Sequence, residues 1–367
     1  MSVNLKKWVP AAVASLVVAA AAIAVPISAN AAVSLPSKTP AQVLAMVGQS
    51  KVSAFSGTIK QTSNLGLPQL PGGSASSFSG GSASGSGSSS ATVASVLSAL
   101  AGSSTARVYV DGATNQRLQI MDNLAERDAI HHGSDVWLYD SKANTVQHSV
   151  LAPKTEKTPL RTTTMTPAQV ADTLINKLDP TTKATVGTNL RVAGRTAYEL
   201  VLTPKASDTL IGSVSIAVDS ATGFPLSVEA TARGQKAPAF QVAFSDVTFA
   251  KPAASTFAFV TPKNAKVTEK AAPALSPYAK APGSGVKSQS KPTVVGTGWD
   301  AVVESPASAN AQVVKLLANK QFAGLATAVT GGRVFHTSLL NVLITSDGRV
   351  VAGSVSTERL QAVATAP

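Results

Sequence analysis

In a series of segments between residues 54 and 260, apolar residues recur at every second position, and this pattern constrains the fold more than any other feature of the sequence. Successive side chains of a β-strand point to opposite faces of a sheet, so a strand of this kind has one apolar face. The pattern predicts strands at 54–62, 106–112, 116–122, 135–149, 196–204, 213–220, 224–232, 239–249 and 255–260. Because short turns without helices join most of these segments, we expect an antiparallel meander and not a parallel α/β sheet.

Two segments break this pattern, and both begin with the residues TPAQV, at 39–43 and at 166–170. Thr39 and Thr166 are good helix N-caps, and the proline after each suits the first helical position. The apolar residues that follow fall on one stripe of each helix: Val43, Leu44 and Val47 in the first, and Val170, Leu174, Ile175 and Leu178 in the second. A Thr-Pro start is a common way to begin a helix, so we interpret the repeat as convergence on a good cap and not as a duplicated domain.

Two stretches have the composition of linkers. Residues 66–90 are rich in glycine and serine, and residues 269–295 are rich in proline, alanine and lysine. Such stretches are too polar, and lose too much entropy on ordering, to pack as domains. We expect the first to be an insertion within a domain at 33–268, and the second to separate that domain from a smaller one at 296–367. The apolar stretch at 91–104 predicts an amphipathic helix, which is either a flap on the glycine-serine tether or a surface helix against the sheet.

The N-terminus has the pattern of a secretion signal, residues 1–31. Lys6 and Lys7 precede an apolar run at 8–27, and the small residues Ala29, Asn30 and Ala31 follow it, which predicts cleavage after Ala31. The run is also long enough to cross a bilayer, so an uncleaved anchor is the alternative. Both place the rest of the chain outside the cytoplasm, secreted or in the cell envelope. The chain has no cysteine, which excludes disulfides and a lipid-bearing cysteine, so the fold must rely on a large apolar core.

The charge of the chain bears on its partners. The formal net charge is +12, and the basic residues are scattered along the sequence. Aromatic residues make up only 5% of the chain and do not alternate with basic runs, so nucleic acid is not an expected partner. Scattered positive charge favours loose contact with a membrane surface or an anionic wall polymer. We expect the protein to be a monomer.

The sequence gives no sign of an enzyme. The chain has four histidines, and no HxH or HExxH spacing sets two of them up as metal ligands. No GxSxG motif or phosphate-binding loop is present. We therefore expect no catalytic residue, no metal and no cofactor. The alternative, an enzyme acting on wall or lipid substrates, would depend on His131, His132 or His148.

The stretch DVWLYD at 135–140 carries large apolar residues at four successive positions. Antiparallel sheets usually leave one face to solvent, so apolar side chains on both faces need an explanation. Either both faces of the sheet are covered, or the sheet curves around a hollow that receives an apolar ligand. The sequence leaves open whether Trp137 and Tyr139, or Val136 and Leu138, face that hollow.

The order of these segments resembles that of a known family. A Thr-Pro helix is followed by FSGTIKQT, RVYVDG, QRLQIMD, GSDVWLYDSKANTV, a second helix, GRTAYELVLTPK, VSIAVDSATGFPLSVEA, VAFSDVTFAKP and FAFVTPKNAKV. Over residues 33–268 this order is similar to the LolA-like fold of lipoprotein-sorting carriers and to the N-terminal domain of the RseB/MucB regulators. The resemblance implies an α+β fold with a strongly curved antiparallel sheet, a half-open barrel, whose apolar concave face is covered by helices and holds acyl chains.

This resemblance also implies a binding site. The cavity would be lined by Phe55, Ile59, Val108, Leu118, Ile120, Trp137, Leu138, Tyr198, Leu200, Leu202, Val214, Ile216, Val218, Phe224, Leu226, Val228, Phe240, Val242 and Phe244. The two TPAQV helices would form one lid, with Val43, Leu44, Val47, Val170, Leu174 and Leu178 facing the cavity.

The C-terminal region, 296–367, predicts a small α+β domain. It consists of a helix at 311–322, two strands around the turn Ser346-Asp347-Gly348, and a final helix from Ser356 or Thr357. The region is either a partner-binding module or a domain that stabilises the first.

The leading hypothesis is an exported carrier or binding protein that holds a lipid or lipoprotein acyl chain without enzymatic activity. The alternative implied by the resemblance is an envelope-stress regulator of the RseB kind. In such a regulator the large domain senses lipoprotein and the small one contacts an anti-sigma factor.

Overall fold

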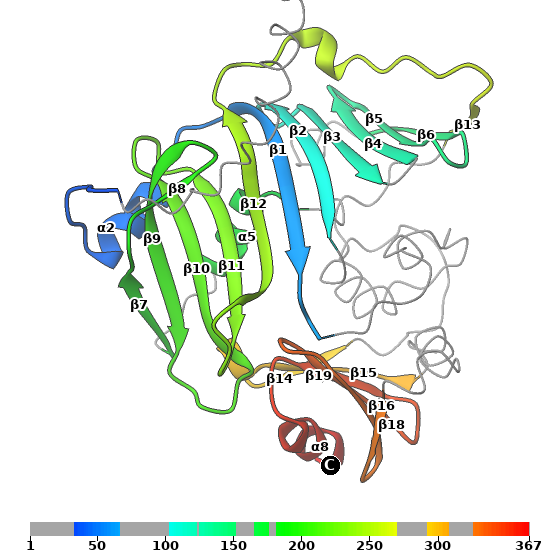
Figure 1. The fold of residues 1–367 in the computed structure, drawn as a ribbon. Helices are drawn as coiled ribbons and strands as arrows, with labels where there is room; N and C mark the ends of the chain where they lie inside the picture. The colour runs from blue at the N-terminus through cyan, green and yellow to red at the C-terminus, as the bar shows by residue number, and fades with distance from the viewer. Residues whose placement is uncertain are drawn as a thin grey trace, which may run out of the picture.

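The computed structural model describes residues 33–66, 103–122, 125–151, 165–175, 181–269, 292–307 and 326–366 of the chain. These residues form two β-sheets, one of 13 strands and one of six, with the smaller sheet near one end of the larger (Figure 1). The predicted signal at 1–31, the stretch at 91–102, Leu178 and the helix at 311–322 lie outside the described residues.

The large sheet confirms the predicted meander. It contains β1 (Ala54–Ser63), β2 (Ser104–Asp111), β3 (Asn115–Asp122), β4 (Ala125–His132), β5 (Asp135–Asp140), β6 (Thr145–Val150), β7 (Thr182–Val186), β8 (Leu190–Val192), β9 (Arg195–Pro204), β10 (Ile211–Asp219), β11 (Pro225–Ala232), β12 (Pro238–Thr248) and β13 (Lys266–Glu269). Strand β1 pairs with both β2 and β12 and so joins the two halves of the meander. Only β13 pairs in parallel, with β6. The sheet is curved but open, because its edge strands β7 and β13 do not pair with each other (Figure 1).

One face of this sheet is apolar and the other polar, as the alternating sequence predicts. Residues paired across neighbouring strands lie on the same face of a sheet. One row across β9 to β12 consists of Leu200, Ile216, Val228 and Val242, all buried. The next row lies on the other face and consists of Val201, Ser215, Glu229, Gln241 and Thr62, in which only Val201 is apolar. The apolar face therefore holds the core of the domain, and we call it the inner face.

Two helices pack on the inner face, α2 (Pro40–Gly48) and α5 (Pro167–Ile175). Both begin with the capping box that the TPAQV repeat encodes. Thr39 accepts a hydrogen bond from the backbone of Gln42 at 3.3 Å, and Gln42 accepts one from the backbone of Thr39 at 2.8 Å. Thr166 and Gln169 repeat the pattern at 3.2 and 2.9 Å. The repeat is thus explained by local chemistry that satisfies the free N–H groups of a helix start.

Removing either cap is expected to cost stability. We expect Thr166→Ala to lower the free energy of unfolding by about 1 kcal/mol, because the N–H of Gln169 loses its acceptor. Urea unfolding followed by circular dichroism measures this difference. Thr173→Ala in the exposed part of the same helix is the matched control, and it should not destabilise the protein because alanine has the higher helix propensity.

The outer face of β3 and β4 is covered by a segment that the sequence predicted to be a strand. Residues 255–260 do not pair with the sheet; Ala254–Phe257 form a 3-10 helix, η2, that packs on β3 and β4. Phe257 is buried there, and Arg117 donates a hydrogen bond to the carbonyl of Thr256 at 3.0 Å. The prediction of a strand was wrong because the alternating phenylalanines cover a sheet instead of extending it.

The small sheet is formed by the C-terminal region. It contains β14 (Thr293–Val295), β15 (Val302–Ser305), β16 (Ala326–Val329), β17 (Gly332–His336), β18 (Asn341–Thr345) and β19 (Val350–Gly353). Helix α8 (Thr357–Thr365) has Ser356 as its N-cap and packs Leu360 and Val363 against one face of the sheet. The predicted hairpin and final helix are confirmed. The predicted linker extends too far, because β14 within it pairs with β15.

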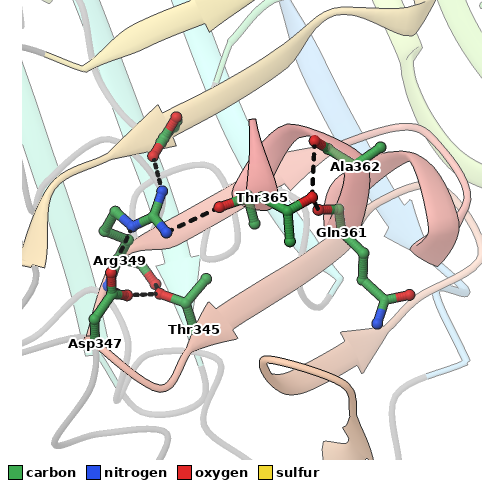
Figure 2. Close-up of polar contacts among 8 residues, drawn as sticks. Thr345, Asp347, Arg349, Gln361, Ala362 and Thr365 are labelled. Atoms are coloured by element: carbon green, nitrogen blue, oxygen red, sulfur yellow. Dashed lines mark hydrogen bonds and ion pairs between the residues drawn. The ribbon is translucent and has the colours of Figure 1, made fainter. Parts of the chain in front are cut away.

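We call the small sheet with α8 the small domain. Arg349 links several of its elements by hydrogen bonds (Figure 2). It donates to Asp347 at 2.8 Å, to Glu304 of β15 at 2.6 Å and to the carbonyl of Ala364 in α8 at 2.9 Å. Hydrogen bonds from Thr345 and Arg349 hold the pKa of Asp347 at about 2, well below its usual range. The Asp347-Gly348 turn is therefore fixed to its neighbours, and this cluster is structural.

Candidate functional site

The inner face of the large sheet is the largest apolar surface that the described residues form. Its buried residues come from β1 to β3, from β9 to β12 and from both helices of the large domain. Helix α2 contacts β7, β9 and β10, and α5 contacts β11 and β12. Neither α2 nor α5 has a contact of this extent with β2 to β6, which form the other half of the curved sheet (Figure 1). The two helices thus cover the half of the inner face at β7 and β9 to β12.

The half formed by β2 to β6 changes from apolar to polar across the strands. One row consists of Val108, Leu118, Ala129, Leu138 and Gln147. The neighbouring row consists of Val110, Gln116, His131, Val136 and Ser149. Leu138 is 36% exposed, which is unusual for a leucine on the apolar face of a sheet. This half therefore offers hydrocarbon contacts near β1 and hydrogen-bonding groups near β6.

The buried polar groups of this half hold the turns at the ends of the hairpins. The amide of Gln116 donates to the carbonyl of Ala113 at 3.0 Å. Nε2 of His131 lies 2.9 Å from the carbonyl oxygen of Gly133. These contacts fix the shape of the sheet edge, so the two side chains are held in place as part of the wall.

Three phenylalanines form the centre of the inner face where the two halves meet. The ring of Phe224 lies 4.9 Å from that of Phe55 and 6.0 Å from that of Phe244. Phe55 and Phe244 meet edge to face at 6.0 Å. Such pairs stabilise a core beyond the area that they bury. The three rings thus form one apolar cluster where the two halves of the sheet meet.

The turn between β10 and β11 positions helix α2. Asp219 is 1% exposed and accepts hydrogen bonds from Arg195 at 2.6 and 3.1 Å and from the backbone of Thr222 at 2.8 Å. Burial alone would raise the pKa of Asp219, but the hydrogen bonds from Arg195 and Thr222 outweigh it and lower the pKa. In the same turn, Gly223 has φ 73°, and a Cβ atom there would lie 2.1 Å from the carbonyl oxygen of Met46 in α2. The turn at 219–223 is therefore in close contact with α2 and fixes its position. We call this turn the seat of α2.

An open pocket of about 490 Å³ lies beside this seat. It is lined by Gln49, Lys51, Val52, Ser53, Ala54, Ala221, Thr222 and Phe249. Its walls are mixed in polarity, and it lies at the last turn of α2. The pocket leaves space next to that end of the helix.

The structure places nearly all of the predicted cavity residues on the inner face, with one exception. Trp137 pairs with Ile130 and His148 on the outer face, where its ring stacks on His148 at 3.7 Å and on Phe259 at 5.0 Å. Its inclusion in the cavity was therefore wrong. The structure decides which residues of the DVWLYD stretch share the apolar face, since Val136 and Leu138 lie on the inner face.

The lid residues of α2 and α5 face the core. Val43 and Val47 are buried, and Leu44, Val170, Leu174 and Ile175 pack partly buried against the same cluster. Leu339 of the small domain belongs to the same cluster. No pattern in the sequence indicated Arg195, Asp219 or Leu339 as part of this site. Their roles depend on contacts between segments that are far apart in the chain.

His148 has a hydrogen-bonding partner at each nitrogen of its ring. His148 bridges Asp135 at 2.7 Å and Glu269 at 2.9 Å and so fastens β13 to β5 and β6. His131 is buried and His132 exposed, which agrees with their predicted positions on opposite faces. Within the described ranges, no group of three or more acidic or histidine side chains is placed to hold a metal ion. Among the same residues, no helix has the length and hydropathy needed to span a bilayer.

Comparison with known proteins gives similarities of fold only. No family profile and no curated sequence matches the chain. The structure is similar to MucB of Pseudomonas aeruginosa in its complex with MucA, with 15% identity and a TM-score of 0.42 over 88% of this chain and 97% of that one. A LolA superfamily protein from Nitrosomonas europaea matches with 10% identity and a TM-score of 0.21 over 61% of this chain and 99% of that one. An uncharacterized conserved protein from Thermus thermophilus matches with 12% identity and a TM-score of 0.33 over 63% of this chain and 98% of that one.

Both families that the sequence resembles are thus among the similar structures. Likenesses this distant do not say what the chain binds. That has to be inferred from its own side chains.

Proposed function

We propose that this protein is an exported, non-enzymatic lipid-binding protein that holds an acyl chain of a lipid or lipoprotein on the inner face of its large sheet. The observation that carries the proposal is the half of this face at β2 to β6. There Val108, Leu118 and Leu138 share one row of the inner face, and Leu138 is 36% exposed, while α2 and α5 cover the other half. An apolar surface of this kind is typical of a binding site for an apolar ligand.

The expected affinity follows from the hydrophobic effect. Burying one methylene gains about 0.8 kcal/mol, so ten enclosed methylenes would contribute about 8 kcal/mol, close to the free energy of a micromolar complex. Part of this gain is lost to immobilisation of the ligand. A lipid group therefore needs about ten or more methylenes, as in a long acyl chain, to bind with about micromolar affinity.

The two helices act as the lid in this proposal. Their apolar stripes cover the half of the face at β7 and β9 to β12, which would otherwise expose hydrocarbon to water. The pocket beside the last turn of α2 leaves space for that end of the helix to shift. The seat at Asp219 and Gly223 sets its closed position.

A second candidate is a regulator that reports bound lipid to a protein partner such as an anti-sigma factor. The observation that favours it is the contact of the small domain with one end of the inner face. Partner binding by the full chain separates the candidates. A regulator should capture a protein partner whose binding changes when lipid is bound, whereas a simple carrier should capture none.

Native mass spectrometry of the protein purified from an expressing cell tests the proposal directly. We expect co-purified lipid, and uptake of a fluorescent fatty acid after the protein has been delipidated. Repeated recovery of lipid-free protein that also fails to take up the fluorescent probe would contradict the proposal.

A further inference from the structure

The small domain inserts one side chain into the core of the large domain. Leu339, in the loop between β17 and β18, is 4% exposed and belongs to the apolar cluster of the inner face. Leu65, Ile211 and Ala232 belong to the same cluster. Ile211 and Ala232 pair across β10 and β11, at the end of the sheet where β1 also ends. Leu339 thus closes one end of the apolar face.

The loop that carries Leu339 is rigid. Thr337 accepts hydrogen bonds from the backbone of Leu339 at 3.3 Å and of Leu340 at 2.9 Å, and its own hydroxyl donates to the carbonyl of Leu340 at 2.7 Å. Ser338 donates its N–H to the carbonyl of Leu65 at 3.0 Å. Leu339 therefore lies in a hydrogen-bonded turn, and this turn is bonded to Leu65, two residues after the end of β1.

Two further contacts hold the small domain at this end of the large sheet. Thr209 and Val355 form an isolated antiparallel bridge, and Thr209 donates its hydroxyl to the carbonyl of Ser354 at 2.8 Å. Trp299 donates its indole N–H to Thr182 at 2.8 Å and packs against the same apolar cluster. All these hydrogen bonds join uncharged groups, for which water is a ready substitute.

We infer that the small domain is a displaceable stopper, and that an acyl chain long enough to reach Leu65 and Ile211 takes the place of Leu339 and releases it. The inference rests on the proposed function and adds its regulation. Leu339 and the end of a long acyl chain have the same chemistry and need the same surface. By linkage, docking of the small domain must weaken the binding of long chains by the factor by which long chains weaken docking.

The cysteine-free chain allows a direct test with one disulfide. Directly paired residues of antiparallel strands have Cα atoms at a distance that a disulfide can bridge, so Thr209→Cys with Val355→Cys should lock the domain when oxidised. Trp8→Phe and Trp137→Phe leave Trp299 as the one tryptophan, and its emission then reports docking. The reduced protein is the matched control for the oxidised one, because both carry the same substitutions.

The probes are palmitic acid and the shorter decanoic acid. We expect palmitic acid to shift the emission of Trp299 to the red in the reduced protein and not in the oxidised one. Oxidation should weaken palmitic acid binding at least tenfold and leave decanoic acid binding unchanged. Equal binding of palmitic acid to both forms, without a change at Trp299, would overturn the stopper and leave the lipid-binding function intact. If neither acid binds to either form, both proposals fail.

A second variant tests the same inference without a crosslink. Leu339→Ala should strengthen binding of palmitic acid severalfold, because the stopper loses its apolar contact. Val294→Ala, at a position that is 61% exposed on β14, is the control and should change nothing. An unchanged affinity in the Leu339→Ala variant would count against the competition between the leucine and the ligand.

Discussion

Asp219→Ala is expected to lower the free energy of unfolding by about 3–5 kcal/mol, because several hydrogen bonds to one charged group, worth about 1.5–3 kcal/mol each, are lost together. Asp219 is the acceptor for Arg195 and for the backbone of Ala221 and Thr222, so its loss leaves the guanidinium and the turn without their partner. The seat of α2 should loosen with the turn. Urea unfolding measures the loss, and hydrogen exchange in α2 shows whether it reaches the helix.

Asp219→Asn is the matched control, because it keeps an oxygen for the turn and removes only the charge. We expect a smaller loss of about 1.5–3 kcal/mol, the range for hydrogen bonds to charged groups. The pKa of Asp219 is lowered in the folded protein, so the carboxylate contributes its full stability above the ordinary aspartate pKa of 3.8, and this contribution is lost as the pH falls below that value. The difference between wild type and the asparagine variant should therefore shrink in acid. A difference that does not depend on pH would show that the charge of Asp219 is not what stabilises the turn.

The regular part of the fold could be predicted from the sequence because local chemistry and burial agree there. In 213–219 the alternation of Val214, Ile216 and Val218 with small or polar residues permits only one orientation of the strand. The two helices were predictable for the same reason, since Thr39 and Thr166 satisfy the helix start and the apolar stripe fits the core.

The orientation of β5 could not be predicted, because Trp137 and Leu138 are both large and apolar. The choice depends on the segment 254–260, in which η2 covers the outer face of β3 and β4 and Phe259 stacks on Trp137. The same segment explains the wrong strand at 255–260. Alternating apolar residues indicate burial on one side, and they do not say whether a neighbouring strand is available for pairing.

The contact between the two domains was also beyond sequence reasoning. Leu339 follows a strand in a polar loop, and nothing in its neighbours indicates that it enters the core of another domain. Asp219 has the sequence of an ordinary turn residue, and its role requires Arg195 from the neighbouring strand. Contacts of this kind depend on how the sheet curves, which the alternating pattern does not specify.

Leu138→Glu is expected to weaken acyl-chain binding about thirtyfold or more while the fold is kept. Leu138 is 36% exposed on the inner face, so a polar side chain can be accommodated by the empty protein. With ligand bound, the variant loses the contact of a leucine, worth about 2 kcal/mol or about thirtyfold in affinity, and places a carboxylate against hydrocarbon. A neutral fluorescent diacylglycerol is the proper probe, because a fatty acid would also be repelled by the new charge.

Met121→Glu is the matched control for this variant. Met121 is also 36% exposed, but it lies on the outer face, where it pairs with Thr105 and Glu126. We expect its affinity for the diacylglycerol to equal that of the wild type, with both variants unfolding at similar urea concentrations. If both variants bind as tightly as the wild type, the ligand does not lie on β2 to β6. If both lose binding equally, the effect is one of charge or stability and not of the inner face.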